Sequence, residues 1–305
     1  MKNLEYLSKS LTELLDEANK TRKKYNVYDL EICSIMNAKS GKCSEDCAYC
    51  AQSSFNETNA KVYPLKSEKE IIEKAIFAEK NGADRFGIVT SGNNLSDEEI
   101  EIISRAIKYI TENFKIKVCG SLGNLSIEKL EKLKVSGMDR YHHNIETSKS
   151  FYKKIVSTHS FEDRIETIKR AKSLGFSVCS GGILGLGESF EDRIEMANIL
   201  SDLDVDSVPI NILIRIDGIK LSGNEPMPYI DIIKTIAIFR IILKDKNIRF
   251  CGGRELNLKD FQGMGFLAGA NGIMIGGYLT NSGRDISDDQ KLIVEVKRLF
   301  EALKN

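Results

Sequence analysis

Residues 43–50 read Cys43-Ser44-Glu45-Asp46-Cys47-Ala48-Tyr49-Cys50 and follow a short apolar run, residues 30–36, that is typical of a buried strand. The three cysteines lie in a polar, irregular stretch over residues 37–65. A connection longer than about 15 residues in a compact domain is usually functional. We therefore expect a ligand-binding loop directly after the first strand.

From this loop onward, helical patterns alternate with short apolar runs. Capping-box pairs, Ser67 with Glu70 and Ser96 with Glu99, mark two of the helix starts. The apolar runs are continuous, which suits parallel strands buried on both faces. We expect helices over 3–24, 67–81, 96–113, 126–136, 148–174 with a break near 158–159, 189–203, 228–244, 258–268 and 287–303. The other expected strands are 84–89, 115–120, 140–144, 176–181, 205–214, 248–251 and 272–275.

Eight strands, nearly all followed by helices, predict an α/β fold, a (β/α)8 TIM-type barrel with an N-terminal helix and a C-terminal helix. With only 4 prolines and no Pro/Gly/Ser-rich linker, we expect one domain over 1–305. Its parts would be an N-terminal helical extension (1–28), the barrel (29–280) and a C-terminal helix (281–305). A doubly wound sheet stays open as an alternative, because the spatial order of strands is not written in the sequence.

The overall composition argues against several partner classes. Lys+Arg and Asp+Glu are both 44, so net charge favours neither nucleic acid nor an anionic membrane. The N-terminus lacks a secretory pattern, and no stretch approaches the roughly 20 apolar residues that span a bilayer. We therefore expect a cytoplasmic protein whose 7 cysteines are reduced and serve metal binding, catalysis or burial.

The loop cysteines Cys43, Cys47 and Cys50 have the spacing C-x3-C-x2-C. Thiolates are soft ligands for iron–sulfur clusters or zinc, but a structural zinc site usually closes with four protein ligands. Three thiolates would leave one iron of a cubane [4Fe–4S] cluster open for a substrate or cosubstrate. We therefore favour a cluster with one open iron, with a zinc loop as the alternative.

Further candidate residues lie at the carboxyl ends of predicted strands, where barrel active sites form. Cys119, Cys179 and Cys251 share this position, and Arg249 is on the same strand as Cys251, so we expect a second metal site. Cys33 lies earlier, on the first strand, and is expected to be buried packing. Polar strand ends, 141–146 and 207–211, and the Gly-rich segment 180–188 suggest a polar ring around a ligand that the backbone approaches closely.

Together these features resemble the radical S-adenosylmethionine superfamily and, within it, the biotin synthase family. The cysteine loop is specific only to the superfamily. The branch is indicated by residues 37–53, by VCSGGILGLGE (178–188) and by VPIN (208–211), within a resemblance that runs from about Asp29 to Leu279.

This resemblance implies radical sulfur insertion that converts dethiobiotin into biotin, with two S-adenosylmethionine molecules cleaved to 5′-deoxyadenosyl radicals. It implies a [4Fe–4S] cluster, S-adenosylmethionine and a sulfur-donating auxiliary cluster, [2Fe–2S] in the usual pattern. The implied partners are dethiobiotin and an electron donor such as flavodoxin or ferredoxin, in a homodimer, with neither nucleic acid nor membrane.

The resemblance also implies residue roles. Cys43, Cys47 and Cys50 would hold the radical cluster, with Tyr49 packing on the adenine. The other implied S-adenosylmethionine contacts are Asn144, Glu146, Arg164 (to the methionine carboxylate) and Ile183. The implied dethiobiotin contacts are His142, Asn144 and Asn211, and the implied auxiliary-cluster ligands are Cys119, Cys179 and Arg249.

Two positions depart from the family pattern. Gly87 stands where a further auxiliary-cluster cysteine is usual, and His142 stands where Asn is usual. We hypothesise that Cys251 replaces the missing ligand and that the cluster is rebuilt, with an iron and sulfur count that is free to differ. A Cys251→Ala variant would then lose auxiliary iron and keep the radical cluster.

Three other functions stay open at this point. A relative of the hydrogenase-maturation or methylornithine-forming type would share the barrel and the loop but act on another small substrate. Residues 268–277 resemble a phosphate-binding strand end of a lyase or isomerase, which would leave the cysteine loop unexplained. A cluster carrier would bind iron and sulfide without consuming S-adenosylmethionine.

Overall fold

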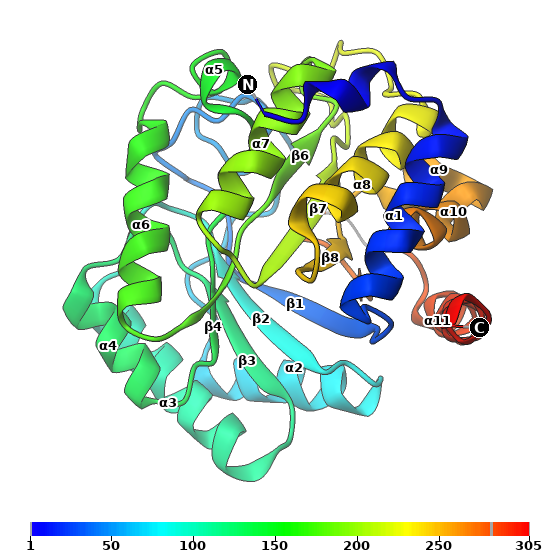
Figure 1. Ribbon diagram of the computed structural model, residues 1–305. Helices are drawn as coiled ribbons and strands as arrows, with labels where there is room; N and C mark the ends of the chain where they lie inside the picture. Colours follow the sequence, from blue (N-terminus) through cyan, green and yellow to red (C-terminus); the bar gives the residue numbers. More distant parts are fainter. Residues whose placement is uncertain (1, 281–282, 305) are drawn as a thin grey trace.

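A computed structural model describes residues 2–280 and 283–304. Within these residues, nine parallel strand segments form one sheet in the order β5-β4-β3-β2-β1-β9-β8-β7-β6, and β5 also pairs with β7. The sheet thus closes, and β5 and β6 share one barrel position, so the predicted (β/α)8 barrel is confirmed (Figure 1). The strands are β1 (Glu31–Lys39), β2 (Arg85–Thr90), β3 (Lys117–Ser121), β4 (Arg140–His142), β5 (Ser177–Cys179), β6 (Gly182–Leu184), β7 (Ser207–Ile212), β8 (Asn247–Phe250) and β9 (Gly272–Met274).

Helices surround the barrel, and α1 lies against α8 and α10 on its outside (Figure 1). The helices begin where the capping residues predict, as at Ser67 and Ser96, whose side chains accept from the amides of Glu70 and Glu99. They are η1 (Leu4–Ser8), α1 (Leu11–Tyr25), α2 (Glu68–Lys80), α3 (Asp97–Asn113), α4 (Ile127–Val135), α5 (Lys149–Tyr152), α6 (Phe161–Ser173), α7 (Phe190–Asp202), α8 (Tyr229–Leu243), α9 (Arg254–Leu258), η2 (Lys259–Phe261), α10 (Gln262–Ala268) and α11 (Ile286–Lys304). Every helix among the described residues is too short or too polar to cross a bilayer.

Three predicted elements are divided in the structure. The expected helix 3–24 is η1 and then α1, because Ser10 and Glu13 form a capping box that starts a new helix. The region 258–268 continues from α9 through η2 into α10. The expected strand 176–181 ends at Cys179, and β6 resumes at Gly182. The first division follows a capping box, and the last occurs at Gly181.

The interruption between β5 and β6 depends on Gly181. A Cβ atom at this position would lie 2.0 Å from the Pro209 carbonyl oxygen on β7. We expect Gly181→Ala to destabilise the protein by about 1–3 kcal/mol, the usual cost of overpacking. Urea unfolding of the cluster-free protein measures this loss. Gly263→Ala in α10, where a Cβ meets nothing within 4 Å, is the control, and equal midpoints for the two variants would contradict the prediction.

Candidate active site

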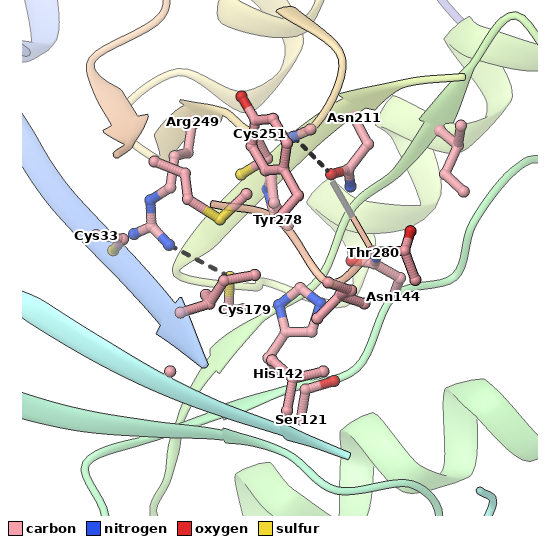
Figure 2. A pocket seen from close by; sticks show the side chains of 18 of the residues that line it. Cys33, Ser121, His142, Asn144, Cys179, Asn211, Arg249, Cys251, Tyr278 and Thr280 are labelled. Carbon is pink, nitrogen blue, oxygen red and sulfur yellow. Dashed lines mark hydrogen bonds between the residues drawn. The ribbon is translucent and has the colours of Figure 1, made fainter. Parts of the chain in front are cut away.

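A cavity of about 340 Å³ lies inside the barrel and is lined by side chains from every strand position and from the cysteine loop. It brings together most of the residues that the sequence singled out, as Figure 2 shows for part of the lining. The predicted site residues among its lining are Tyr49, Cys50, Cys119, His142, Asn144, Glu146, Cys179, Ile183, Asn211, Arg249 and Cys251. Cys43, Cys47 and Arg164 are not part of the lining surface.

The cysteine loop is held in shape by its own backbone. Cys43 N–H donates to the Gln52 carbonyl (3.1 Å), and the Cys43 carbonyl accepts from Ser54 N–H (2.9 Å). The Asn56 side-chain amide donates to the carbonyls of Cys47 (3.1 Å) and Cys50 (2.8 Å). These bonds fix the three cysteine backbones before any ligand arrives.

A second segment, residues 155–159, supports the loop from outside. Ala48 N–H donates to the Ile155 carbonyl (2.9 Å), and the Asp46 carboxylate accepts from the amides of Ser157 (2.9 Å) and Thr158 (3.2 Å). Burial alone would raise the pKa of Asp46, but these hydrogen bonds outweigh it and lower the pKa to about 2. The carboxylate therefore stays ionised and keeps the loop attached to this segment.

Two of the loop thiols, those of Cys47 and Cys50, are protonated when no metal is bound. Burial raises the pKa of Cys47 to about 12 and that of Cys50 to about 11, so metal binding must displace their protons. Within the described ranges, no three Cys, His, Asp or Glu side chains converge closely enough to hold a single ion.

The predicted S-adenosylmethionine residues lie beside the loop. Asn144 Oδ1 accepts from Gly181 N–H (3.1 Å), and its amide donates to Glu146 Oε2 (3.3 Å). Glu146 has a φ of 68°, and its carbonyl accepts from Ile183 N–H (2.9 Å). The backbone of the Gly-rich segment therefore fixes Asn144, Glu146 and Ile183 together.

Arg164 lies behind these residues. Its Nη1 donates to the Asn144 carbonyl (2.9 Å) and lies 3.6 Å from Glu146 Oε1, while its Nε donates to Tyr152 Oη (2.6 Å). Nη2 is 2.9 Å from His159 Nε2. The side chain thus contacts the predicted S-adenosylmethionine residues without reaching the cavity surface.

Two of the predicted dethiobiotin residues occupy the middle of the cavity (Figure 2). Asn211 Oδ1 accepts from Gly252 N–H (3.1 Å), and its amide donates to the Gly182 carbonyl (3.3 Å). His142 lies close to Cys179 and influences its pKa. An amide and an imidazole at these positions can donate hydrogen bonds to, and accept them from, the polar ring of a ligand.

The deeper part of the cavity carries a second set of thiols. Cys119 Sγ accepts from Arg85 Nη1, and Cys179 Sγ accepts from Arg249 Nη1, each at 3.9 Å. Burial would raise the pKa of Cys179, but His142 and Arg249 outweigh it and lower the pKa to about 6. Arg249 Nε is buried with no hydrogen-bond partner, so this region offers an unused donor beside the thiols, which fits an anionic sulfur-rich ligand.

Cys33 also belongs to this deeper set: it is buried, as predicted, and its place in the cavity lining adds to that prediction. It is 5% exposed, lines the cavity, and lies beside the Arg249 guanidinium (Figure 2). The sequence missed it because Cys33 comes early in β1, away from the carboxyl end where site residues were sought.

A buried charge cluster below the thiols was also missed. Glu31 accepts from Arg85 Nε (2.5 Å) and Arg140 Nη1 (2.9 Å), and it pairs with Arg249. Burial would raise the pKa of Glu31, but Arg249, Arg140 and Arg85 outweigh it and lower the pKa to about 2. The available signal was a charged residue inside or at the start of four strands that are otherwise apolar.

Comparisons with known proteins agree with this arrangement. The model of the Radical SAM superfamily matches residues 38–200, and the model of the Biotin and Thiamin Synthesis associated domain matches residues 209–297. The chain is 52% identical over 272 residues to the biotin synthase of Thermotoga neapolitana, covering 89% of this chain and 97% of that protein. It is 48% identical over 301 residues to the biotin synthase of Thermotoga petrophila, covering 98% and 99%.

Solved structures share the fold at lower identity. Methylornithine synthase (PylB) superposes with a TM-score of 0.78 at 21% identity, covering 96% of this chain and 91% of that one. The hydrogenase maturase HydG from Carboxydothermus hydrogenoformans gives 0.79 at 17%, covering 95% and 72%. These likenesses concern the barrel alone, so they do not favour the activity of either protein over that of the relatives at about 50% identity.

Proposed function

The chain belongs to the biotin synthase family of the radical S-adenosylmethionine superfamily, and on that premise we propose which of its residues perform each part of the reaction. Its activity is the radical insertion of sulfur into dethiobiotin to form biotin. When bound, the [4Fe–4S] cluster and S-adenosylmethionine supply a carbon radical that can take hydrogen from unactivated C–H bonds.

The radical cluster would be held by Cys43, Cys47 and Cys50. Their backbones are fixed by the hydrogen bonds of the loop and by its attachment to residues 155–159. Three thiolates leave one iron free for the amino and carboxylate groups of S-adenosylmethionine. Tyr49, which lines the cavity beside Cys50, would cover the adenine.

S-adenosylmethionine would lie along the Gly-rich segment. Asn144 and Glu146 present polar groups to the cavity, and Ile183 adds an apolar surface. Arg164 provides the positive charge that a methionine carboxylate needs, through its position next to Glu146 and the Asn144 carbonyl. Its removal would also release Asn144 and Glu146, so Arg164 acts partly as a positioning residue.

Dethiobiotin would lie between the two thiol sets. The ureido ring has two N–H donors and a carbonyl acceptor, which the amides of Asn211 and Asn144 and the imidazole of His142 can match. Apolar neighbours such as Ile212 and Leu213 line the same cavity and suit the aliphatic part of the substrate. The cavity walls would also exclude water from the radical.

The auxiliary cluster would occupy the deeper thiol set, with Cys119, Cys179 and Cys251 as ligands and Arg249 as a further ligand or donor. Cys251 is buried and lines the cavity with the others, which supports it as the replacement for the ligand missing at Gly87. We propose that this cluster supplies the sulfur, and that its iron and sulfur count follows this altered ligand set.

The observation that carries these assignments is one cavity whose lining includes Tyr49 and Cys50 of the cysteine loop, the deeper thiols, and the amides of Asn144 and Asn211. The test is anaerobic reconstitution with iron and sulfide, followed by dithionite, S-adenosylmethionine and dethiobiotin. We expect mass spectrometry to detect both 5′-deoxyadenosine and biotin. Formation of 5′-deoxyadenosine without biotin or a thiolated intermediate would contradict the assignment of an auxiliary cluster at the deeper thiols as the sulfur source.

The remaining expectations stay predictions. A cytoplasmic setting is supported by seven free cysteines, since thiols persist in a reducing compartment. The homodimer, the flavodoxin or ferredoxin donor, the absence of nucleic-acid and membrane partners, and the single-domain organisation rest on the resemblance and the sequence.

A further inference from the structure

Four thiols, not three, surround the deeper part of the cavity. Cys33, Cys119, Cys179 and Cys251 are each less than a tenth exposed, and all four line the same cavity. They come from β1, β3, β5 and the end of β8, so they reach the cavity from different sides of the barrel.

The strand register places Cys33 level with Cys251. Cys33 pairs with Met274 on β9, and Gly272, two residues before Met274, pairs with Arg249 on β8. Cys251 is two residues beyond Arg249, so Cys33, Met274 and Cys251 form one row. Alternate strand residues face the same side, and all three line the cavity.

The neighbouring strand β2 has no side chain at position 87 that could act as a ligand. Gly87 on β2 pairs with Ile35 on β1, and a Cβ atom at Gly87 would lie 3.0 Å from Ile35 Cγ2. The side chain of Ile35 thus occupies the space that a residue larger than glycine would use at position 87. The same strand that fills this space presents Cys33 two residues earlier.

Positively charged side chains lie beside these thiols. Arg249 has Cys33 and Cys179 beside its guanidinium (Figure 2), and Arg85 donates to Cys119. Glu31 pairs with both of these arginines and with Arg140, and Asp139 also pairs with Arg85, so three guanidiniums face two carboxylates. A surplus of buried positive charge stabilises an anionic group next to it.

We propose that Cys33 is a ligand of the auxiliary cluster, which completes a four-cysteine set with Cys119, Cys179 and Cys251. Four cysteines are the usual ligand set of protein-bound iron–sulfur clusters. Arg249 then serves as a hydrogen-bond donor to the cluster while it remains paired with Glu31. This inference rests on the proposed auxiliary site and changes its ligand set from the family pattern.

The test uses the full chain with the radical cluster removed by Cys43→Ala, Cys47→Ala and Cys50→Ala, so that the remaining iron reports the deeper site. After anaerobic reconstitution, we expect Cys33→Ala in this background to lower iron and sulfide per chain by about half or more. A cluster that keeps only three of its four cysteine ligands is bound less tightly. Cys179→Ala is the reference for a lost ligand. Met274 lies in the same row but is not a proposed ligand, so Met274→Leu should leave the iron and sulfide contents unchanged.

A second variant separates ligation from folding. Cys33→Ser keeps the size of the side chain but offers a harder oxygen donor, so its Mössbauer spectrum should change even where iron is retained. Iron, sulfide and spectra identical to the background in both Cys33 variants would overturn the proposal. A background protein that binds no iron at all would instead overturn the auxiliary site itself, and the role of Cys33 with it.

Discussion

A Cys47→Ala variant is expected to form no detectable 5′-deoxyadenosine from S-adenosylmethionine, with or without dethiobiotin. In the proposed site the radical cluster would be held by three thiolates, and Cys47, 8% exposed, is the middle one. With two thiolates left, two irons of a cubane would lack protein ligands, so the cluster should be lost. Mass spectrometry of the nucleoside and iron analysis measure the two effects.

Ser44→Ala is the matched control for this experiment. Ser44 lies on the same loop, and its hydroxyl contacts only the neighbouring Glu45 side chain, so its removal should leave S-adenosylmethionine cleavage close to the starting level. The iron of the deeper thiol set should persist in Cys47→Ala. Nucleoside formation by Cys47→Ala at the rate of Ser44→Ala would refute the assignment of the loop as the radical-cluster site.

Glu31→Gln should have the largest effect on stability. Glu31 is the carboxylate that Arg85, Arg140 and Arg249 share inside the barrel. Removing one partner of a buried ion pair costs about 3–5 kcal/mol, because the remaining charges are left uncompensated. The free energy of unfolding of the cluster-free protein, measured in urea, should fall by about that amount.

The pH dependence of stability gives an independent check. The pKa of Glu31 is lowered from 4.5 to about 2 in the folded protein, so the folded state favours the ionised form. Its contribution is fully present above the unfolded pKa near 4.5 and is lost as the pH falls toward 2. Between these values, the wild-type protein should lose this increment of stability, while Glu31→Gln should lack it.

Glu166→Gln provides the control for Glu31→Gln. Glu166 pairs with Lys169 on the exposed face of α6, where both side chains are more than half exposed. Exposed pairs of this kind contribute about 0–1 kcal/mol. If Glu31→Gln were no more destabilising than Glu166→Gln, the buried charge cluster would be irrelevant to stability.

Much of the fold could be predicted because its signals are local. Capping boxes at Ser67 and Ser96 and continuous apolar strands gave helices and strands close to those observed. The site was predictable where it follows one strand directly, as in the cysteine loop, or where carboxyl strand ends meet, as for Cys119 and Cys179. Such inferences need only the rule that these ends gather on one side of a barrel.

The remaining features depend on how strands are aligned with one another. Cys33 was assigned to packing because it lies early in β1, away from the carboxyl strand ends where site residues were expected. Only the register with Met274 and Arg249 places it beside the other thiols. The convergence of three arginines on Glu31 arises in the same way, from residues far apart in sequence that meet at one depth of the barrel.

The contact between Ile35 and position 87 also constrains how this protein can evolve. A cysteine introduced at Gly87 alone would press its Cβ atom against Ile35, at 3.0 Å, and would arrive at a site that already has four thiols. Substitutions in contact are often not additive, so the effect of a side chain at position 87 is expected to depend on the residue at position 35.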